Sequence, residues 1–256
     1  MKIVVLLKQV PSSESSLRLD PDKNWIQEDN ITFAVNESDS YALEEALQIR
    51  EKLGDSEIIV ISLGPERASR TIREGLSKGA DRGIHIVESF PYTSDPFEAA
   101  SVLATVLKDE NFDLILTGLQ SDDIGTGQTG VILGEMLGMS TATLVMETEL
   151  NGNDLRVKRE LESGWFQWLS MKLPSCITIQ SGINTPRYPS LKGIMGAKKK
   201  EIKTVSKEEL AANSALQSIK KVYIPQKTKR TEMIEGDTDQ VAGQLTEILK
   251  RDIRVL

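Results

Sequence analysis

The sequence has almost no cysteine or histidine: its 256 residues include one of each, Cys176 and His85. One cysteine excludes a disulfide within the chain. Together the two residues cannot build a four-ligand zinc site or an iron–sulfur cluster held by four thiolates. A Ser-His-Asp or Cys-His catalytic device would have to use His85 alone. If the protein handles electrons, we therefore expect the reactive chemistry to belong to a bound small molecule.

Positive charge is also in deficit, since 31 Lys and Arg face 38 Asp and Glu and leave a net charge of -7. This balance opposes a general nucleic-acid binder, whose affinity comes mainly from neutralising phosphates. No apolar run approaches the roughly 20 residues of a membrane span, and the first residues lack the features of a signal peptide. A single free cysteine fits a reducing compartment. We expect a cytoplasmic protein with no membrane insertion and no nucleic-acid partner.

Apolar runs that suit buried strands alternate with helical patterns through about residue 140. This alternation predicts an α/β fold with a doubly wound, mostly parallel sheet of the Rossmann type, with ligands at the carboxyl ends of the strands. The expected strands are residues 3–7, 57–63, 83–88 and 112–117, and the expected helices are residues 41–49, 68–78, 95–108 and 131–137.

The pattern changes after residue 140. Residues 144–150 and 155–161 read as strands joined by the turn Asn-Gly-Asn-Asp at 151–154, a strong hairpin signal. With residues 165–173 and 176–179 they predict antiparallel additions to the sheet. We place a nucleotide-binding domain at 1–184 and an extended C-terminal arm at 185–256, with a short helix within 208–219, an extended stretch at 223–236 and a final helix at 238–253. Such an arm is expected to lie on this domain or on a partner chain.

The glycine-rich loop, residues 118–130, is the best candidate site because it joins a buried strand to a helix. Glycines let the backbone approach a ligand closely, and the start of the next helix offers free N–H groups to an anion. Thr126, Gln128 and Thr129 suit phosphate oxygens, while Asp122 and Asp123 suit a ribose hydroxyl or an adenine amine. The loop is neither a P-loop nor a G-x-G-x-x-G motif. The alternative is a surface turn that merely favours glycine.

Other segments also fall at strand ends or helix starts, namely Leu6, residues 36–39 and residues 63–65. In a parallel sheet such ends converge on one crevice, which favours a nucleotide site there. For Asn36 and Asp39 the alternative is simple capping of the following helix. We interpret His85 as a satisfied or edge-exposed structural histidine and Cys176 as a small buried hydrophobe.

Taken together, these residues resemble the β subunit of the electron transfer flavoprotein family over nearly the whole chain. The most diagnostic stretch is Asn-Thr-Pro-Arg-Tyr-Pro-Ser-Leu-Lys-Gly-Ile-Met at 184–195. Stretches at 223–225 and 233–236 are similar to the bacterial branch that serves amine dehydrogenases, hence a prokaryotic protein. The other matching segments are residues 2–9, 36–39, 43–46, 62–65, 79–82, 118–122, 128–130, 159–162 and 173–178.

The resemblance implies an adenine nucleotide alpha hydrolase-like fold and a heterodimer with an α subunit that holds the redox-active FAD. The β subunit would bind AMP as a structural group and carry no catalytic residue of its own. Gln128 and Thr129 would hold the phosphate, and Gly127 stands where several relatives have Asn. The implied contacts are Leu6, Asn36, Glu37, Ser38, Asp39, Leu63, Gly118, Leu119, Gln120, Ser121, Asp122, Asp123, Ile124, Gly125, Thr126, Gly127, Gln128 and Thr129.

The family's recognition loop matches residues 187–200, hereafter the docking segment, with Leu191 as the anchor that enters a partner dehydrogenase. Lys192 and the lysines at 198–200 make a local basic exception beside it. Electrons would pass from dehydrogenase donors through the FAD towards a quinone-linked acceptor. The residues expected to dock are Arg187, Tyr188, Leu191, Ile194 and Met195.

Three alternatives remain open at this stage. A bifurcating branch of the family carries a second FAD in place of AMP and tends to have Asp-Gly-Asp-Thr in its loop, where this chain has Asp123-Ile124-Gly125-Thr126. A free-standing adenine-nucleotide-binding regulator would need no flavin-bearing partner. A purely structural subunit would have an empty crevice.

Overall fold

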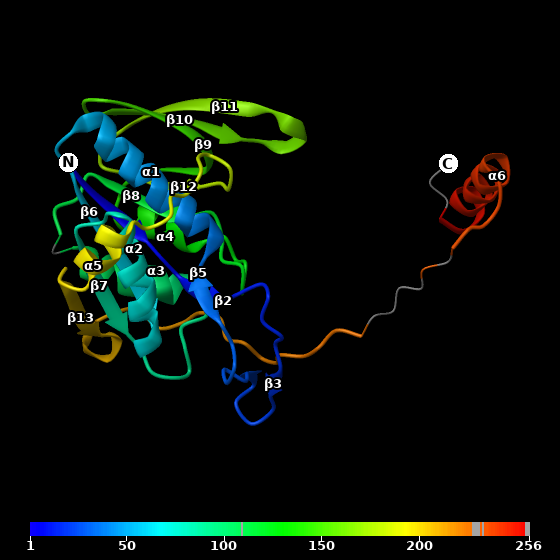
Figure 1. The fold of residues 1–256 in the computed structure, drawn as a ribbon, viewed down its shortest axis with the longest axis horizontal. Helices are drawn as coiled ribbons and strands as arrows, with labels where there is room; N and C mark the ends of the chain where they lie inside the picture. Colours follow the sequence, from blue (N-terminus) through cyan, green and yellow to red (C-terminus); the bar gives the residue numbers. More distant parts are fainter. Residues whose placement is uncertain (109, 227–230, 232, 254–256) are drawn as a thin grey trace. The chain divides into compact units, whose positions relative to one another are not determined.

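The computed structural model describes residues 1–108, 110–226, 231 and 233–253. The chain divides into two compact units, Met1–Lys221 and Val222–Leu256. The first unit holds the sheet and all the strands, and Figure 1 shows it with its helices. Within the described residues, no helix combines the length and apolarity that a membrane crossing requires.

A nine-stranded sheet with the order β11-β10-β9-β12-β8-β1-β6-β7-β13 is the core of the first unit. Its parallel centre confirms the predicted doubly wound α/β fold. The chain starts at β1, moves to β6 and β7 on one side, and then returns to β8 on the other side of β1. The strand order therefore reverses between β1 and β8. The parallel strands are β1 (Lys2–Leu6), β6 (Glu57–Gly64), β7 (Arg82–Val87), β8 (Leu114–Gly118), β12 (Ser175–Ile179) and β13 (Ile202–Ser206).

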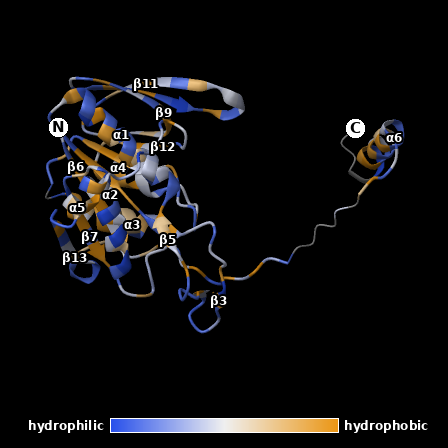
Figure 2. Ribbon diagram, in the orientation of Figure 1, coloured by the Kyte–Doolittle hydropathy of each residue, from blue (hydrophilic) through white to orange (hydrophobic). Residues whose placement is uncertain are grey.

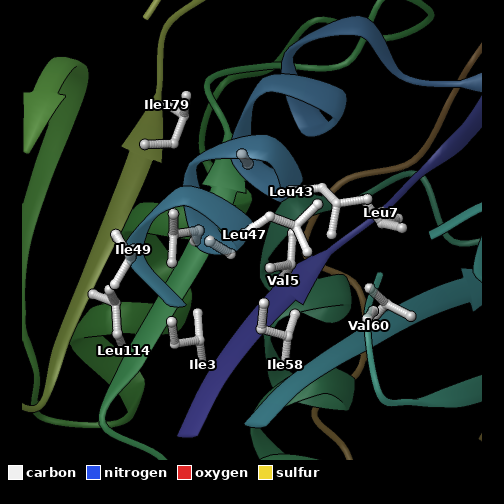
Figure 3. Packing of buried hydrophobic residues seen from close by; sticks show 14 of the residues in the cluster. Ile3, Val5, Leu7, Leu43, Leu47, Ile49, Ile58, Val60, Leu114 and Ile179 are labelled. Carbon is white, nitrogen blue, oxygen red and sulfur yellow. The ribbon is translucent and has the colours of Figure 1, made fainter. Parts of the chain in front are cut away.

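Two layers of helices cover the sheet. Helices α1 (Glu37–Leu53) and α2 (Ser69–Lys78) pack on one face, and α3 (Pro96–Leu107) and α4 (Thr129–Met136) pack on the other. Alternate residues of each strand enter opposite cores. In β1, Val5 packs with the α1 layer and Val4 with the α3 layer. Figure 3 shows the first of these cores, and the orange centre of Figure 2 marks the apolar strands. Each fully buried aliphatic side chain contributes about 1.5–3 kcal/mol.

The strands after residue 140 form the predicted hairpin and its extension. β9 (Ser140–Asn151), β10 (Asp154–Glu160) and β11 (Phe166–Lys172) are antiparallel, with a 3₁₀ turn at Glu162–Gly164. The expectation that residues 176–179 are also antiparallel is wrong, because β12 runs parallel to β8 and to the first half of β9. β9 lies between β12 and β10 in the sheet, and its register against β12 shifts near Leu144, whose φ is 59°.

Two small sheets follow β1. β2 (Gln9–Pro11) pairs with β5 (Phe33–Val35), and β3 (Leu19–Asp20) pairs with β4 (Trp25–Ile26). Both pairs are short, and β3 and β4 form a small antiparallel pair within residues 19–26.

Residues 185–221 belong to the first unit, so the expected boundary at residue 184 differs from the observed division after Lys221. Helix α5 (Leu191–Ala197) contacts α2, and β13 pairs with β7. The helix expected within 208–219 is wrong, because only a 3₁₀ turn at Lys207–Glu209 forms there. The backbone N–H groups of Asn213 and Leu216 instead donate to Ser101 and Asp95 of the α3 region.

The second unit contains the expected final helix, as α6 (Thr238–Ile248) and a π turn at Leu249–Ile253. Asp237 and Gln240 form a reciprocal capping box at its start, which satisfies two backbone donors that a helix end leaves free. The stretch expected to be extended, 223–236, is partly described, since residues 227–230 and 232 lie outside the described residues. Its described residues form neither helix nor strand.

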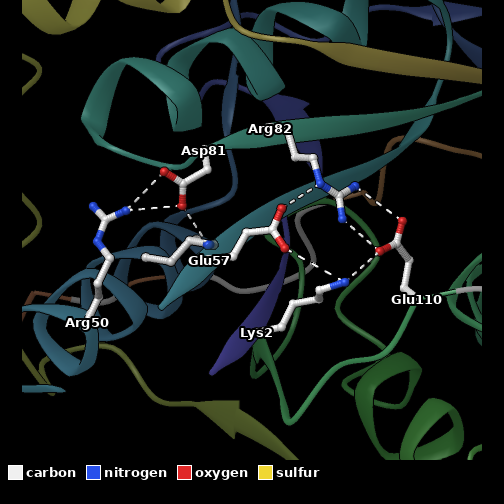
Figure 4. A network of polar contacts seen from close by, with 7 residues as sticks. Lys2, Arg50, Glu57, Asp81, Arg82 and Glu110 are labelled. Atoms are coloured by element: carbon white, nitrogen blue, oxygen red, sulfur yellow. Dashed lines mark hydrogen bonds and ion pairs between the residues drawn. The ribbon is translucent and has the colours of Figure 1, made fainter. Parts of the chain in front are cut away.

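A network of ion pairs lies at the amino ends of the central strands (Figure 4). Arg82 donates to Glu57 at 2.7 Å and to Glu110 at 2.7 Å, and Lys2 lies 3.3 Å from Glu110. The hydrogen bond from Arg82 holds the pKa of Glu110 below its usual value, against the opposing effect of burial. This network lies at the opposite end of the strands from the glycine-rich loop.

Candidate functional site

The predicted site residues meet at the carboxyl ends of β1, β6 and β8. Leu6 and Leu63 stand near the ends of β1 and β6, and the glycine-rich loop leaves β8 for α4. The start of α1 lies against that loop, as the hydrogen bonds below show. Because the strand order reverses between β1 and β8, this is the place where open α/β sheets bind ligands.

Asn36 and Ser38, at the start of α1, hold the glycine-rich loop rather than capping the helix. The Asn36 amide donates to the carbonyl oxygen of Gln120 at 2.9 Å, and its oxygen accepts from the N–H of Asp122 at 2.9 Å. The Ser38 hydroxyl donates to the same Gln120 carbonyl at 2.8 Å. Asn36 occupies the N-cap position of α1 but makes no capping bond with its side chain. Simple capping is therefore the wrong interpretation of Asn36.

The buried side chain of Asp39 links the ends of two strands by hydrogen bonds. Its carboxylate accepts the N–H of Lys8 at 2.7 Å and the N–H of Gly118 at 3.0 Å. Burial raises the pKa of Asp39 to about 6, although these hydrogen bonds oppose the rise. Each carboxylate oxygen accepts one backbone N–H, so Asp39 shapes the site by joining the chain after β1 to the end of β8.

Lys8 is a site residue that the sequence analysis did not single out. Its Nζ lies 2.6 Å from Asp123 and 3.3 Å from the Ser121 hydroxyl. Burial opposes ionisation of Asp123, but the charge and hydrogen bond of Lys8 prevail and lower its pKa. A lysine just past a buried strand was the available signal. The partner lies 115 residues away, which local patterns do not reveal.

Two glycines of the loop are required by close approach. A Cβ on Gly118 would lie 2.2 Å from the Ser38 hydroxyl, and a Cβ on Gly130 would lie 2.5 Å from the Thr117 hydroxyl. Gly125 and Gly127 instead adopt φ values of +68° and +63°, where side chains are strained. Glycine at these four positions is therefore explained by the fit and the turns of the loop itself.

Polar groups remain available at the end of the loop. Within the described residues, the Thr126 and Thr129 hydroxyls and the Gln128 amide make no hydrogen bond to the protein, and Gln128 does not cap α4. The first N–H groups of a helix also lack partners inside it and carry a partial positive charge. These donors suit an anionic oxygen group such as a phosphate. Leu6 and Leu63 add apolar surface on the α3 side of the sheet.

The remaining predicted contacts lie along the same loop. Glu37 donates its backbone N–H to the Asp122 carboxylate at 3.2 Å, and the N–H of Leu119 donates to the Ile179 carbonyl at 2.9 Å. The side chain of Ile124 is exposed. The structure thus brings all the predicted nucleotide residues to one end of the sheet, but it uses many of them to build the loop. Among the described residues, no group of three or more metal-ligating side chains is clustered.

The docking segment forms a separate exposed apolar surface. Tyr188, Leu191 and Met195 are 95%, 82% and 72% exposed, and Ile194 is 43% exposed. Ser190 caps α5 by accepting the N–H of Gly193 at 3.0 Å. No helix was predicted in the docking segment, and α5 was missed because its seven residues include two glycines. The guanidinium of Arg187, by contrast, is bonded to Glu44 and Glu51.

His85 and Cys176 both lie in the core. His85 is 2% exposed, and its Nε2 lies 3.3 Å from the Gly64 carbonyl oxygen. Cys176 is fully buried in β12, and burial raises the pKa of its thiol to about 12. Both positions agree with the structural roles expected from the sequence.

The chain is similar to known proteins over nearly its whole length. The electron transfer flavoprotein domain family matches residues 24–210. The electron transfer flavoprotein subunit beta of Methylophilus methylotrophus is 34% identical over 259 residues, which cover 97% of this chain and 98% of that protein. The Bacillus subtilis (strain 168) protein of the same name is 33% identical over 262 residues, the full length of both chains. The human protein of that name is 34% identical over 253 residues, with 97% and 98% covered.

Proposed function

Because the chain belongs to the family of electron transfer flavoprotein β subunits, we propose that it binds AMP structurally and supports an α subunit that carries FAD. In this role it accepts docking dehydrogenases and helps to pass their electrons towards a quinone-linked acceptor. The protein works in the cytoplasm and contributes no acid, base or nucleophile. The observation that carries the AMP site is the set of free donors at Thr126, Gln128 and Thr129, where the strand order reverses.

The sequence of the loop favours AMP over a second FAD. Gly125 and Gly127 turn the backbone at the point where the phosphate would meet α4, and the Asp-Gly-Asp-Thr stretch of the bifurcating branch is absent. Gln128 and Thr129 then hold one phosphate with the first N–H groups of α4. Gly127 offers no side chain, so backbone donors replace the Asn of several relatives.

Acid release of nucleotides from the purified heterodimer, followed by mass spectrometry, tests this site. We expect one AMP and one FAD per heterodimer. A matched pair of variants localises the AMP: Gln128→Ala lowers AMP occupancy, while Gln167→Ala, an exposed glutamine of β11, does not. Two FAD and no AMP would establish the bifurcating alternative. A stable monomeric chain with bound nucleotide would favour the free-standing regulator, and no nucleotide would favour the empty crevice.

Docking by Leu191 is tested through the rate at which the α-bound FAD is reduced. A flavin-containing amine dehydrogenase, reduced by its amine substrate, serves as the donor. Leu191→Ala is expected to slow this reduction, while reduction by dithionite and the flavin spectrum stay unchanged. Leu17→Ala removes another exposed leucine and is the control. Wild-type transfer in the Leu191 variant would refute the anchor.

We further propose that the second unit packs on the α subunit. Val241, Leu245 and Ile248 recur at helical spacing on α6, and none of them is fully buried by the second unit itself. An apolar stripe of this kind is normally covered by a partner. Deleting residues 222–256 should therefore reduce co-purification of the α subunit. Unchanged recovery of the heterodimer would show that the arm is dispensable for assembly.

A further inference from the structure

Arg187 ties the start of the docking segment to helix α1. Its Nε and Nη2 donate to the two oxygens of Glu44 at 2.8 and 2.9 Å, and its Nη1 donates to Glu51 at 2.6 Å. Its backbone N–H also donates to Glu44, at 3.1 Å. Glu44 is only 5% exposed although it is charged. All three guanidinium nitrogens are thus used within the chain, in the two-pronged geometry that makes Arg–carboxylate pairs strong and directional.

Arg73 holds the other end of α5. From helix α2, its Nη1 donates to the carbonyl oxygens of Ala197 at 2.6 Å and Lys200 at 2.8 Å. The last carbonyls of a helix have no partner inside it, and a cation there is favourable because of the helix dipole. Lys200 reaches in the opposite direction, and its Nζ donates to the carbonyl oxygens of Leu76 and Ala80 at the end of α2.

The two helices also touch closely between these attachments. A Cβ on Gly193 would lie 2.2 Å from the Ser77 carbonyl oxygen, so α5 rests directly on the backbone of α2. Contacts from Arg187 before α5, from Gly193 within it and from Arg73 at its end therefore hold the helix in place. Leu191 and Met195 remain exposed.

The contacts divide the positive charges of the region into two groups. Arg73, Arg187 and Lys200 point inward and are bonded. Lys192, Lys198 and Lys199 are exposed, and their side chains make no hydrogen bond or ion pair within the described residues. The basic surface beside Leu191 consequently consists of these three lysines, and Lys200 is not part of it.

We propose that Arg73 and Arg187 are positioning residues that hold α5 in the orientation that presents Leu191 and Met195 to a donor dehydrogenase. Neither arginine touches the donor. This inference rests on the docking function proposed above. It changes the expected role of Arg187 from a contact with the donor to a residue that positions α5. When α5 is loosened, only a fraction of molecules is ready to dock, and the apparent affinity for the donor falls by that fraction.

Steady-state reduction of the heterodimer by the substrate-reduced amine dehydrogenase separates the KM for the heterodimer from kcat. Arg73→Gln removes the attachment at the end of α5, and Arg187→Gln removes the one before it. We expect each to raise KM about tenfold through a smaller docking-ready fraction, with kcat unchanged. Arg70→Gln is the matched control, because Arg70 lies on the same helix, is exposed, and its side chain makes no hydrogen bond or ion pair within the described residues. Arg73→Lys keeps the charge and is expected to restore part of the affinity.

Amide hydrogen exchange in the heterodimer, without any donor, gives the second measurement. Residues 193–198 should exchange faster in Arg73→Gln and Arg187→Gln, and should be unchanged in Arg70→Gln and Leu191→Ala. Unchanged exchange in α1, with unchanged nucleotide content, shows that the variants fold.

The outcomes separate this inference from the docking function itself. If Leu191→Ala raises KM while both glutamine variants leave KM and exchange unchanged, the positioning role is refuted. If KM rises with no change in exchange, the arginines contact the donor and the inference is also overturned. If Leu191→Ala leaves KM unchanged, the docking function is refuted. Faster exchange in the glutamine variants would still show that the two arginines hold α5 in place.

Discussion

Replacing Asp39 with Asn tests the physical account of the nucleotide end of the sheet. The carboxylate of Asp39 joins the backbone of Lys8 to that of Gly118 and is almost fully buried. Burial raises its pKa from 3.8 to about 6, because two N–H donors do not fully replace the lost water. Asn has nearly the same shape and does not titrate in this range, so Asp39→Asn removes the proton equilibrium with little change in packing.

The sign of the effect follows from which state binds the proton more tightly. The pKa of Asp39 is higher in the folded protein than in the unfolded chain, so its contribution to stability is present at low pH and is lost as pH rises to about 6. The full loss is about 3 kcal/mol, at about 1.4 kcal/mol for each pH unit between the two pKa values. About 2 kcal/mol of it falls between about pH 4.5 and about pH 7.5.

Urea unfolding of the heterodimer, followed by circular dichroism across this pH range, measures the effect. The free energy of unfolding of the wild type minus that of Asp39→Asn should fall by about 2 kcal/mol as pH rises. Asp29→Asn removes an exposed carboxylate and controls for net charge. A difference that stays constant would refute the raised pKa. A difference that grows with pH would show that the two N–H donors outweigh burial.

Three further changes have defined outcomes. Gly134→Ala should lower the free energy of unfolding by about 1–3 kcal/mol through overpacking, since its Cβ would lie 2.2 Å from the Thr141 hydroxyl; an unchanged thermal midpoint would contradict the packing. Arg82→Met removes partly exposed ion pairs of the network in Figure 4. It should lower the free energy of unfolding by about 1 kcal/mol or less, and this difference from the wild type should shrink as salt is added. A difference that does not depend on salt would indicate a loss of packing instead. Cys176 should resist iodoacetamide at neutral pH, because burial shields the thiol and raises its pKa to about 12; rapid alkylation of folded protein, seen by mass spectrometry, would contradict its burial.

The parallel core was predictable because its determinants are local. A strand covered on both faces is a continuous apolar run, and the strands at β1, β6, β7 and β8 lie within a few residues of the expected ranges. The hairpin of β9 and β10 was equally visible from its turn residues. The glycine-rich loop could be found for a similar reason, since close backbone approach leaves glycines in the sequence.

Elements with little core of their own were missed. β13 is an edge strand of mixed polarity, Ile-Lys-Thr-Val-Ser, and it becomes a strand only by pairing with β7. α5 has seven residues and is stabilised by contacts from α1 and α2. Such elements depend on tertiary contacts, which outweigh weak local propensity.

By itself, the sequence determined the order of strands and helices in the core and the place of the glycine-rich loop. Only the tertiary structure decided what the site residues do. Asn36, Ser38 and Asp39 form hydrogen bonds that hold the glycine-rich loop. Lys8 forms an ion pair with Asp123 of that loop, and Arg187 forms one with Glu44 of α1. The reason is that a polar side chain's role depends on which donors and acceptors it meets, and most of these lie far away along the chain.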